Sequence, residues 1–130
     1  MKTAGFSKDE RLKSKKDIDV LVKEGKSLNK EGIKLLWIAT DQEYALPVKV
    51  VFAVPKKMHK RAVDRNTIRR RMREAYRLNK SELHQRLKER NKALNLMFIY
   101  REREIKPYSE IEHKIVLLLK DLCTRHAGNS

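Results

Sequence analysis

The chain alternates between segments whose apolar residues recur every three or four positions and segments whose apolar residues are nearly continuous. The first spacing is typical of a helix with one buried face, and Ile18, Leu21 and Val22 show it near the N-terminus. The second is typical of buried strands, as in 32–40, where β-branched and aromatic residues gather. Along the chain, the pattern predicts helices over about 15–24, from 65 to about 91 and from Pro107 onward, and strands over 32–40, 47–54 and 95–101, with one further short strand beside the first two.

The order of these elements predicts the fold class. It is an α+β fold, an αβββαβα sandwich in which helices pack on one sheet, and residues 1–130 form a single domain. A short polar loop joins strands 32–40 and 47–54, so we expect these strands to pair as an antiparallel hairpin. A long helix separates 47–54 from 95–101, which favours parallel neighbours.

Short polar side chains mark the expected helix starts, because their oxygens accept from the free N–H groups of the first turn. Asn79-Lys80-Ser81 interrupts the pattern of the long helix. The polar ends of the chain, 1–13 and 126–130, are expected to be flexible. The expected capping residues are Ser14 with Asp17, Asp64 for a helix that begins at Arg65, and Ser109 with Glu112.

Four arginines line one side of the long helix. Arg65, Arg69, Arg73 and Arg77 are four positions apart, so they form one row. Like charges at this spacing repel by roughly a few tenths of a kcal/mol per pair, and an anionic partner would relieve that cost. A separate stripe of the same helix is apolar and is expected to face the core: Ile68, Met72, Ala75 and, on its border, Tyr76.

The charge balance indicates the same kind of partner. The chain carries 32 Lys and Arg against 17 Asp and Glu, a net charge of +15, which favours a polyanion, either nucleic acid or an acidic membrane surface. A membrane is disfavoured, because the basic helix lacks an exposed apolar face with Trp or Phe and no apolar run is longer than the five residues of Ile115–Leu119. Cys123 is the single cysteine, and residues 1–11 lack the apolar run of a signal peptide. We therefore expect a cytoplasmic protein.

The sequence shows no constellation of catalytic or metal-ligating residues. The four histidines are scattered and, with one cysteine, give no metal-ligand spacing. The glutamate pairs at 102 and 104 and at 110 and 112 fit surface charges and caps better than a general acid–base pair. The glycines stand singly, so there is no phosphate-binding loop. We expect no catalytic residue and no metal site in the protein itself.

The arginine row is instead typical of a nucleic-acid docking surface. The planar guanidinium matches phosphate and base edges with two donors at once. From Arg65 to Arg77 the row spans roughly 18 Å at 1.5 Å per residue. Three other readings stay open: a small ribosomal or RNA-chaperone protein, a DNA-binding regulator and a stand-alone nuclease. The chain has no helix-turn-helix unit before the basic helix, which disfavours a DNA-binding regulator. It also has no constellation of catalytic groups, which disfavours a stand-alone nuclease.

The stretch from Lys56 to Glu74 resembles the central motif of the bacterial ribonuclease P protein subunit. Arg11-Leu12-Lys13 and the strand Leu96–Tyr100, followed by Arg101, also fall where that family has them. The resemblance covers residues 6–122, nearly the whole chain. In order, the motif residues are Lys56-Lys57, then Arg61-Ala62-Val63-x-Arg65-Asn66-x-Ile68-Arg69-Arg70-x-x-Arg73-Glu74.

The resemblance implies both a fold and a function. The family fold has a left-handed crossover around the arginine-rich helix, against the usual right-handed rule. The family protein binds a large catalytic RNA, and together they remove the 5′ leader from precursor tRNA. The RNA holds the catalytic Mg²⁺ ions, and the protein, which binds no cofactor alone, helps to bind the leader. The implied partners are the ribonuclease P catalytic RNA and precursor tRNA, and neither DNA nor a membrane.

The resemblance also implies which residues contact RNA. Thr67 stands where the family usually has an arginine, a charge that Arg71 is expected to replace in part. The implied RNA-binding residues are Lys56, Lys57, Lys60, Arg61, Arg65, Asn66, Arg69, Arg70 and Arg73, with Arg77 added by the row.

In the family, a cleft between the first helix and the sheet holds the single-stranded leader, and aromatic residues of that helix line it as stacking platforms. Here Ile18 and Val22 stand at those positions, and Leu36 or Trp37 is the strand residue beside them. The aromatic platform is therefore reduced in this chain.

Overall fold

Four helices and four strands make up the part of the chain that the computed structural model describes, residues 10–40 and 47–125. The expected loop at 41–45 lies outside the described residues, as do 1–9 and 126–130. In chain order the elements are α1 (Lys15–Glu24), β1 (Lys26–Lys30), β2 (Ile33–Thr40), β3 (Val48–Ala53), α2 (Ala62–Asn79), α3 (Ser81–Glu89), β4 (Ala93–Tyr100) and α4 (Tyr108–Arg125).

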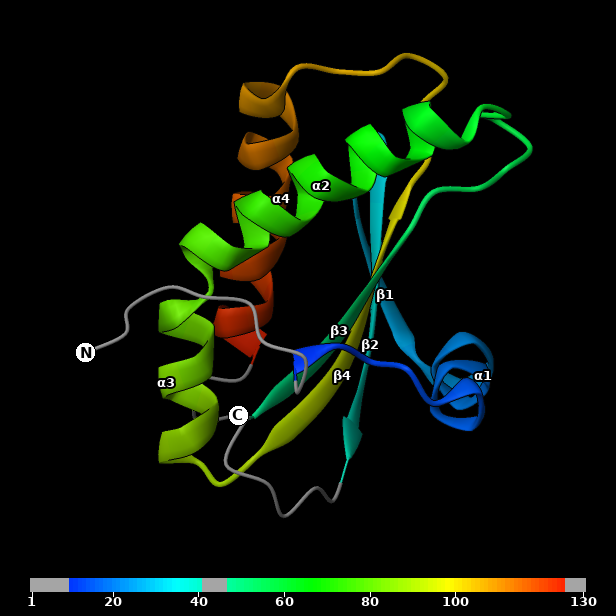
Figure 1. Cartoon of the computed structure of the whole chain (residues 1–130). Helices are drawn as coiled ribbons and strands as arrows, with labels where there is room; N and C mark the ends of the chain where they lie inside the picture. The colour runs from blue at the N-terminus through cyan, green and yellow to red at the C-terminus, as the bar shows by residue number, and fades with distance from the viewer. Residues whose placement is uncertain (1–9, 41–46, 126–130) are drawn as a thin grey trace.

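The four strands form one sheet in the order β1-β2-β4-β3, and the α+β fold class is confirmed (Figure 1). β2 runs antiparallel to β1 and β4, whereas β3 runs parallel to β4, as the long intervening helix predicted. The expected hairpin between 32–40 and 47–54 is wrong, because β4 lies between β2 and β3.

β1 is the hairpin partner of β2, and its polar composition explains why the apolar pattern did not define it. Only Leu28 of this strand is buried. The chain turns back through Glu31 and Gly32, and Gly32 adopts a φ of +87°, which a residue without Cβ tolerates. β4 is buried at every residue except Ile99, so it fits the interior of the sheet better than β3 does.

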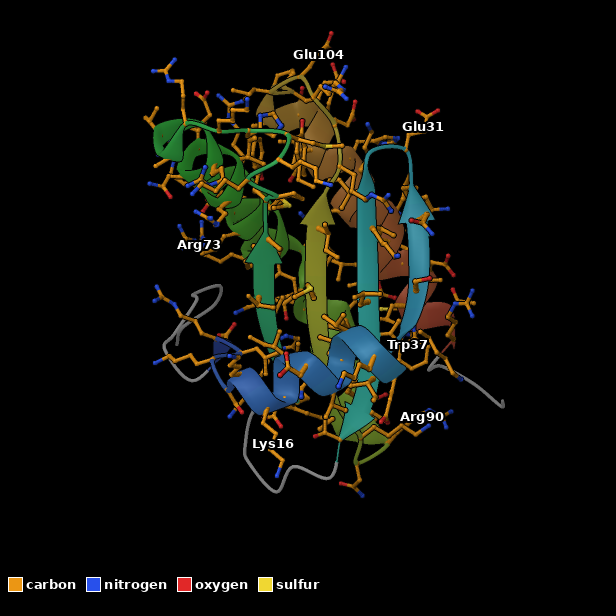
Figure 2. All side chains as sticks on the ribbon, turned by 90° about the vertical axis from the view of Figure 1, so that its right-hand side faces the viewer. Lys16, Glu31, Trp37, Arg73, Arg90 and Glu104 are labelled. Carbon is orange, nitrogen blue, oxygen red and sulfur yellow. The ribbon has the colours of Figure 1, made fainter. Side chains whose placement is uncertain are left out.

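The connection from β3 to β4 through α2 and α3 is left-handed. Figure 2 views the sheet from the α1 side: β3 (green) and β4 (yellow) both point upward, β4 lies to the right of β3, and the connecting helices lie behind the sheet. A right-handed connection behind the sheet would place β4 to the left of β3. The chain therefore has the crossover that the family resemblance implied.

Helices cover both faces of the sheet, and the side chains of β4 alternate between them (Figure 1). Leu96 and Phe98 face α2 and α4 in the main core. Met97 and Ile99 face α1 and belong to a smaller second cluster. The predicted inner face of α2 is confirmed, since Ile68, Met72, Ala75 and Tyr76 are buried. The inner face of α4 consists of Ile111, Ile115, Leu118, Leu119 and Leu122, which are also buried.

The segment Glu10–Lys13 is docked against the sheet, although we expected it to be flexible. The N–H of Leu12 donates to the Val50 carbonyl at 3.0 Å, and the Leu12 side chain is buried in the second cluster. The buried Glu10 carboxylate accepts two bonds from Lys80 Nζ, at 2.7 and 2.9 Å. An apolar anchor and a buried ion pair thus fix this segment.

Of the three expected helix caps, one is confirmed and two are wrong. Ser14 caps α1, because its Oγ accepts from the Asp17 N–H at 3.2 Å. α2 begins at Ala62 rather than Arg65, so Asp64 lies in its first turn instead of capping it. There its carboxylate interacts favourably with the positive end of the helix dipole. Ser109 likewise lies inside α4, whose first N–H bonds go to the Pro107 carbonyl. The break at 79–81 is confirmed, since α2 ends at Asn79 and α3 begins at Ser81.

Candidate RNA interface

A fixed loop connects β3 to α2. The N–H groups of Met58 and His59 donate to the Pro55 carbonyl at 3.2 and 3.3 Å. His59 is buried, and its Nε2 lies 2.6 Å from the Glu102 carbonyl oxygen. Because a carbonyl only accepts, this nitrogen carries the proton and donates. The exposed side chains of the loop are Lys56, Lys57 and Lys60.

Arg65 contributes to the shape of this loop. Its Nη1 donates to the carbonyl oxygens of His59 and Lys60, at 2.9 Å each. The arginine therefore ties the first turns of α2 to the end of the lysine-bearing loop.

Asn66 and Arg69 form a polar pair on the surface of α2. Arg69 Nη1 donates to Asn66 Oδ1 at 2.7 Å. One of the five guanidinium N–H donors is used in this bond, so the others can meet a phosphate. The amide holds the guanidinium in one orientation, which lowers the entropic cost of binding. Arg73 lies one turn further along the row, and Figure 2 shows it beside the β3 edge of the sheet.

Arg77 is paired within α2. Its Nε and Nη2 donate to the two carboxylate oxygens of Glu74, at 3.0 and 2.6 Å. The hydrogen bond from Arg77 lowers the pKa of Glu74, and the same bond raises the pKa of Arg77. The charge at the C-terminal end of the row is thus partly neutralised, and the net positive charge is concentrated toward the N-terminal part of α2.

Thr67 and Arg71 make separate contacts. The Thr67 hydroxyl donates to the Val63 carbonyl of its own helix at 3.0 Å. Arg71 Nη1 donates to the Lys106 carbonyl at 2.7 Å, which fixes the segment between β4 and α4. Arg71 thus uses one donor in a structural contact, and its partial replacement of the missing charge stays a prediction.

The basic face of α2, as we use the term, comprises the loop lysines and the arginines and asparagine that follow. Arg61 has a side chain 76% exposed and lies 4.0 Å from the Asp64 carboxylate, an ion pair that solvent screens. Asn66 and Arg70 are exposed, whereas the four row arginines are half-buried. Its residues are Lys56, Lys57, Lys60, Arg61, Arg65, Asn66, Arg69, Arg70, Arg73 and Arg77.

The α1 side of the sheet carries three of the four residues named for the leader cleft. Ile18 packs against the second cluster, and Leu36 belongs to it. Val22 is 56% exposed on the neighbouring turn of α1. The register Leu36↔Met97 fixes this arrangement.

Trp37 lies on the opposite face of the sheet and is buried in the main core. Lys26 Nζ lies 5.4 Å from the centre of its ring, a cation–π contact at the edge of the sheet. Of the two strand candidates, only Leu36 therefore lies on the α1 side of the sheet, and Trp37 stabilises the fold.

Two cations near the N-terminus join the site, and the sequence pattern did not assign them to it. Arg11 and Lys13 line a cavity of about 290 Å³ together with Arg69 and Arg73. The backbone bond from Leu12 to β3 brings them there. Cations on either side of an apolar residue, in an extended segment before a helix, were the available signal.

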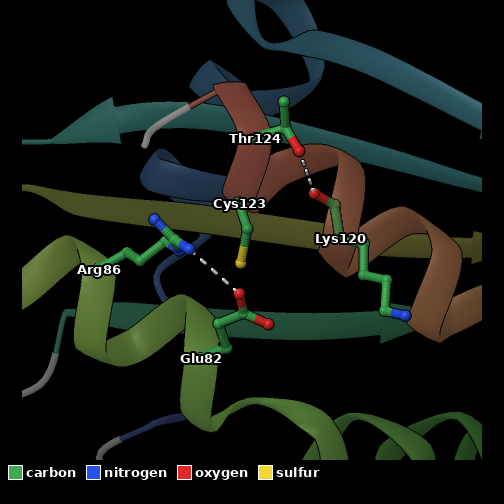
Figure 3. Close-up of a pocket in the computed structure, with 5 residues that line it drawn as sticks. All are labelled: Glu82, Arg86, Lys120, Cys123 and Thr124. Carbon is green, nitrogen blue, oxygen red and sulfur yellow. Dashed lines mark hydrogen bonds and ion pairs between the residues drawn. The ribbon is translucent and has the colours of Figure 1, made fainter. Parts of the chain in front are cut away.

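A cavity of about 320 Å³ between α3 and α4 has a different character (Figure 3). Arg86 in this cavity lies 3.3 Å from the Glu82 carboxylate, so the two charges offset each other. Burial raises the pKa of the Cys123 thiol, which keeps it protonated and unreactive. Nothing in this lining favours a nucleic acid.

Within residues 10–40 and 47–125, no group of three or more His, Cys, Asp or Glu side chains could hold a metal ion. None of the helices in the described part of the chain is long and apolar enough to cross a membrane.

Comparisons with known proteins agree with this geometry. A family model described as ribonuclease P matches residues 6–123. The chain is 33% identical over 127 residues to the ribonuclease P protein component of Porphyromonas gingivalis, a match that covers 98% of this chain and 90% of that protein. The structure of the Thermotoga maritima RNase P protein superposes with a TM-score of 0.68 at 27% identity, covering 86% of this chain and 96% of that one.

A solved structure of the Staphylococcus aureus RNase P protein shares the fold, with a TM-score of 0.71 at 21% identity over 92% of this chain and 98% of that chain. The central motif, the left-handed crossover and these matches lead to one conclusion. The chain belongs to the ribonuclease P protein family and is a protein subunit of that endoribonuclease complex, in which its partner is ribonuclease P RNA.

Proposed function

We propose that this chain binds the catalytic RNA through the basic face of α2 and helps that RNA to remove the 5′ leader from precursor tRNA in the cytoplasm. The observation that carries the proposal is the concentration of cations on one side of the molecule. Lys56, Lys57, Lys60, Arg61 and Arg70 are exposed, and Arg69 is held in place beside them.

The electrostatics of this face predict how strongly binding depends on salt. If about six phosphates are neutralised, log K falls with log[salt] with a slope of about −4 to −5, because each contact releases a condensed counterion. This term supplies affinity without sequence preference. The defined contacts, such as the Asn66–Arg69 pair, supply orientation.

The α1 side of the sheet is the proposed site of the single-stranded leader. Ile18, Ile38 and Val51 are partly exposed apolar residues there, and they pack on the buried Leu36 and Met97. Without aromatic residues on α1, base stacking contributes less than it does where an aromatic platform is present. Leader binding then depends on apolar contact and on cations that meet the backbone.

We assign the hydrolysis itself to the RNA subunit and its Mg²⁺ ions. Mg²⁺ prefers carboxylates together with phosphate oxygens and water, and the described residues provide no carboxylate cluster of that kind. The protein's residues have the complementary role: they bind RNA, orient the precursor and reduce the repulsion between two polyanions.

Reconstitution tests the proposal. The purified protein alone should leave precursor tRNA intact, but it should raise leader cleavage by a bacterial ribonuclease P RNA at low Mg²⁺, where the RNA alone is slow. If the protein does not stimulate the RNA over a range of Mg²⁺ concentrations, the proposal is wrong.

A charge-removal pair locates the RNA-binding face. Lys57→Ala with Arg70→Ala should weaken binding to the catalytic RNA and reduce the salt slope by about 1.5, since each lost phosphate contact contributes about 0.7 to 0.9. Lys92→Ala with Lys120→Ala is the matched control, because it removes two exposed charges from other surfaces. Equal slopes for both double variants would exclude this face.

A further inference from the structure

The segment between β4 and α4, residues 101–107, contacts three other parts of the molecule through Glu102. The Glu102 carbonyl accepts the hydrogen bond from His59 Nε2, and its carboxylate accepts from Lys114 Nζ of α4 at 2.8 Å. A Cβ at Gly32, in the turn between β1 and β2, would overlap the Glu102 side chain, so this turn packs directly against it. We call these four residues, Gly32, His59, Glu102 and Lys114, the Glu102 junction.

The junction is built on a segment that is itself fixed. The Tyr100 hydroxyl donates to the Glu104 carbonyl at 2.6 Å and accepts from the Lys106 N–H at 3.1 Å. Arg71 of α2 donates to the Lys106 carbonyl at 2.7 Å. Bonds from β4 and from α2 therefore hold this segment in place before any RNA is bound.

His59 connects the fixed segment to the lysine-bearing loop. Its side chain is buried, and its ring lies 5.8 Å from the Tyr100 ring, measured between centroids. The bond from its Nε2 to Glu102 is 2.6 Å long and joins residues 43 positions apart, so it ties the loop to a distant part of the chain. A loop with a buried, hydrogen-bonded anchor samples fewer conformations than a loop without one.

The loop is thus held from two sides. On the α2 side, Arg65 binds the carbonyls of His59 and Lys60, and on the β4 side Glu102 binds the His59 ring. Arg65 is itself a member of the basic face, so a change at Arg65 would alter RNA contacts and loop position together. None of the four junction residues belongs to the basic face, so the junction affects the position of the loop alone.

We propose that the Glu102 junction positions the lysine-bearing loop for RNA, with His59 and Glu102 as positioning residues that do not contact the RNA themselves. A loop that is already in place need not be ordered when the complex forms, so its lysines meet their phosphates at a lower entropic cost. The inference rests on the proposed function, because it requires that the basic face of α2 binds the catalytic RNA.

Two substitutions of His59 separate its hydrogen bond from its packing. His59→Phe keeps a ring beside Tyr100 but removes the donor, whereas His59→Gln keeps a side-chain N–H that can reach the Glu102 carbonyl. We expect His59→Phe to bind ribonuclease P RNA about tenfold more weakly than the wild type, because the loop must then be ordered on binding. His59→Gln should restore the affinity to within about twofold of the wild type.

Two further variants keep the test independent of one substitution. Gly32→Ala displaces the Glu102 side chain from the turn without changing the loop, and it should also weaken RNA binding. Ile115→Val removes one methyl group from the main core away from the junction, so it is the control for a general loss of stability. Measured below the melting temperature of every variant, the affinity of Ile115→Val should equal that of the wild type.

A tethered probe follows the loop itself in the complex. An iron chelator attached through Met58→Cys, with Cys123→Ser so that one thiol remains, cleaves nearby RNA by hydroxyl radicals. Position 58 lies within the loop and outside the basic face. With His59 present, the cuts should fall on a few adjacent nucleotides. His59→Phe should spread them over more positions, and His59→Gln should restore the narrow pattern.

Equal affinity and an equally narrow cleavage pattern for His59→Phe and the wild type would overturn the inference. It would also be overturned if His59→Gln lost as much affinity as His59→Phe, or if Ile115→Val did so. These results would leave the proposed function intact as long as Lys57→Ala with Arg70→Ala weakens RNA binding. If that double variant binds the RNA as the wild type does, the proposed function itself fails.

Discussion

On one face of the sheet, α2, α3 and α4 cover the strands, and Leu94, Leu96, Phe98 and Tyr100 are fully buried. On the other face, α1 and the segment 10–13 leave several side chains only partly covered: Ile38, Val51, Ala53 and Ile99. We call these the closed face and the open face. The closed face supplies most of the buried area, and the open face keeps an apolar surface within reach of solvent.

Helix length explains the difference. α2 and α4 have 18 residues each and are about 27 Å long, close to the 26 Å or so of an eight-residue strand. α1 has 10 residues, is about 15 Å long and buries only Leu21 completely. A helix of that length leaves part of the strands uncovered, next to the cations at the β3 edge. The difference between the faces therefore suggests a division between folding stability and binding.

The largest expected effect compares neighbours on β4 that point to opposite faces. Phe98→Ala on the closed face should lower the free energy of unfolding by about 3–5 kcal/mol, because it leaves a cavity in a packed core. Met97→Ala on the open face should cost about 2 kcal/mol or less, since its site can be filled by solvent or by movement of α1. Urea unfolding of both variants measures the difference, and equal losses would show that the two faces are equally closed.

The second expected effect tests how dry the closed face is. Tyr76 is fully buried against Phe98 and its Oη lies 2.8 Å from His84 Nε2. Burial, with Lys80 and Lys88 nearby, lowers the pKa of His84 from 6.5 to about 4. The neutral ring accepts the tyrosine hydrogen bond. His84 takes up a proton near pH 6.5 in the unfolded chain but only near pH 4 in the folded chain. The contribution of neutral His84 to the free energy of unfolding is therefore complete above pH 6.5 and is lost as the pH falls toward 4.

The size of this contribution follows from the pKa shift. At 1.36 kcal/mol per pKa unit, it amounts to about 3 kcal/mol between pH 7 and pH 4. The stability of the wild type should fall between pH 6.5 and pH 5, and His84→Gln should remove that fall. The melting temperature of each protein at each pH measures the difference. His113→Gln, which changes an exposed histidine on α4, is the control. An unchanged profile for His84→Gln would mean that water reaches this site on the closed face.

Much of this architecture was predictable from the sequence, because the strongest signals are periodic. The apolar stripe of α2 and the break at Lys80 follow from local spacing. The position of β4 between β2 and β3 was not predictable, because strand order depends on which strand can be buried on both faces. A further short strand was expected, but the pattern did not give its position, because β1 has a single buried residue.

For the site, spacing placed the arginines in one row but did not reveal their separate bonds. Arg65 binds loop carbonyls, Arg69 binds Asn66 and Arg77 binds Glu74. These contacts join residues from other elements or depend on rotamers, which the sequence pattern does not encode. The same holds for Arg11, whose role depends on a backbone bond between Leu12 and β3.

The smallest expected effect tests whether the open face binds the leader. Ile18→Phe places an aromatic ring on α1 where the side chain is half-buried, so the free energy of unfolding should change by no more than about 0.5 kcal/mol. Binding of precursor tRNA to the reconstituted complex should tighten by about 1 kcal/mol, the lower end of the range for stacking of one base on an aromatic ring. Ile105→Phe, at a 40% exposed position between β4 and α4, is the control for added apolar area. Titration of each complex with precursor and with mature tRNA measures the preference. If Ile18→Phe tightens the binding of precursor and mature tRNA equally, the gain does not come from the leader. The open face would then not be the leader-binding surface that its short helix leaves uncovered.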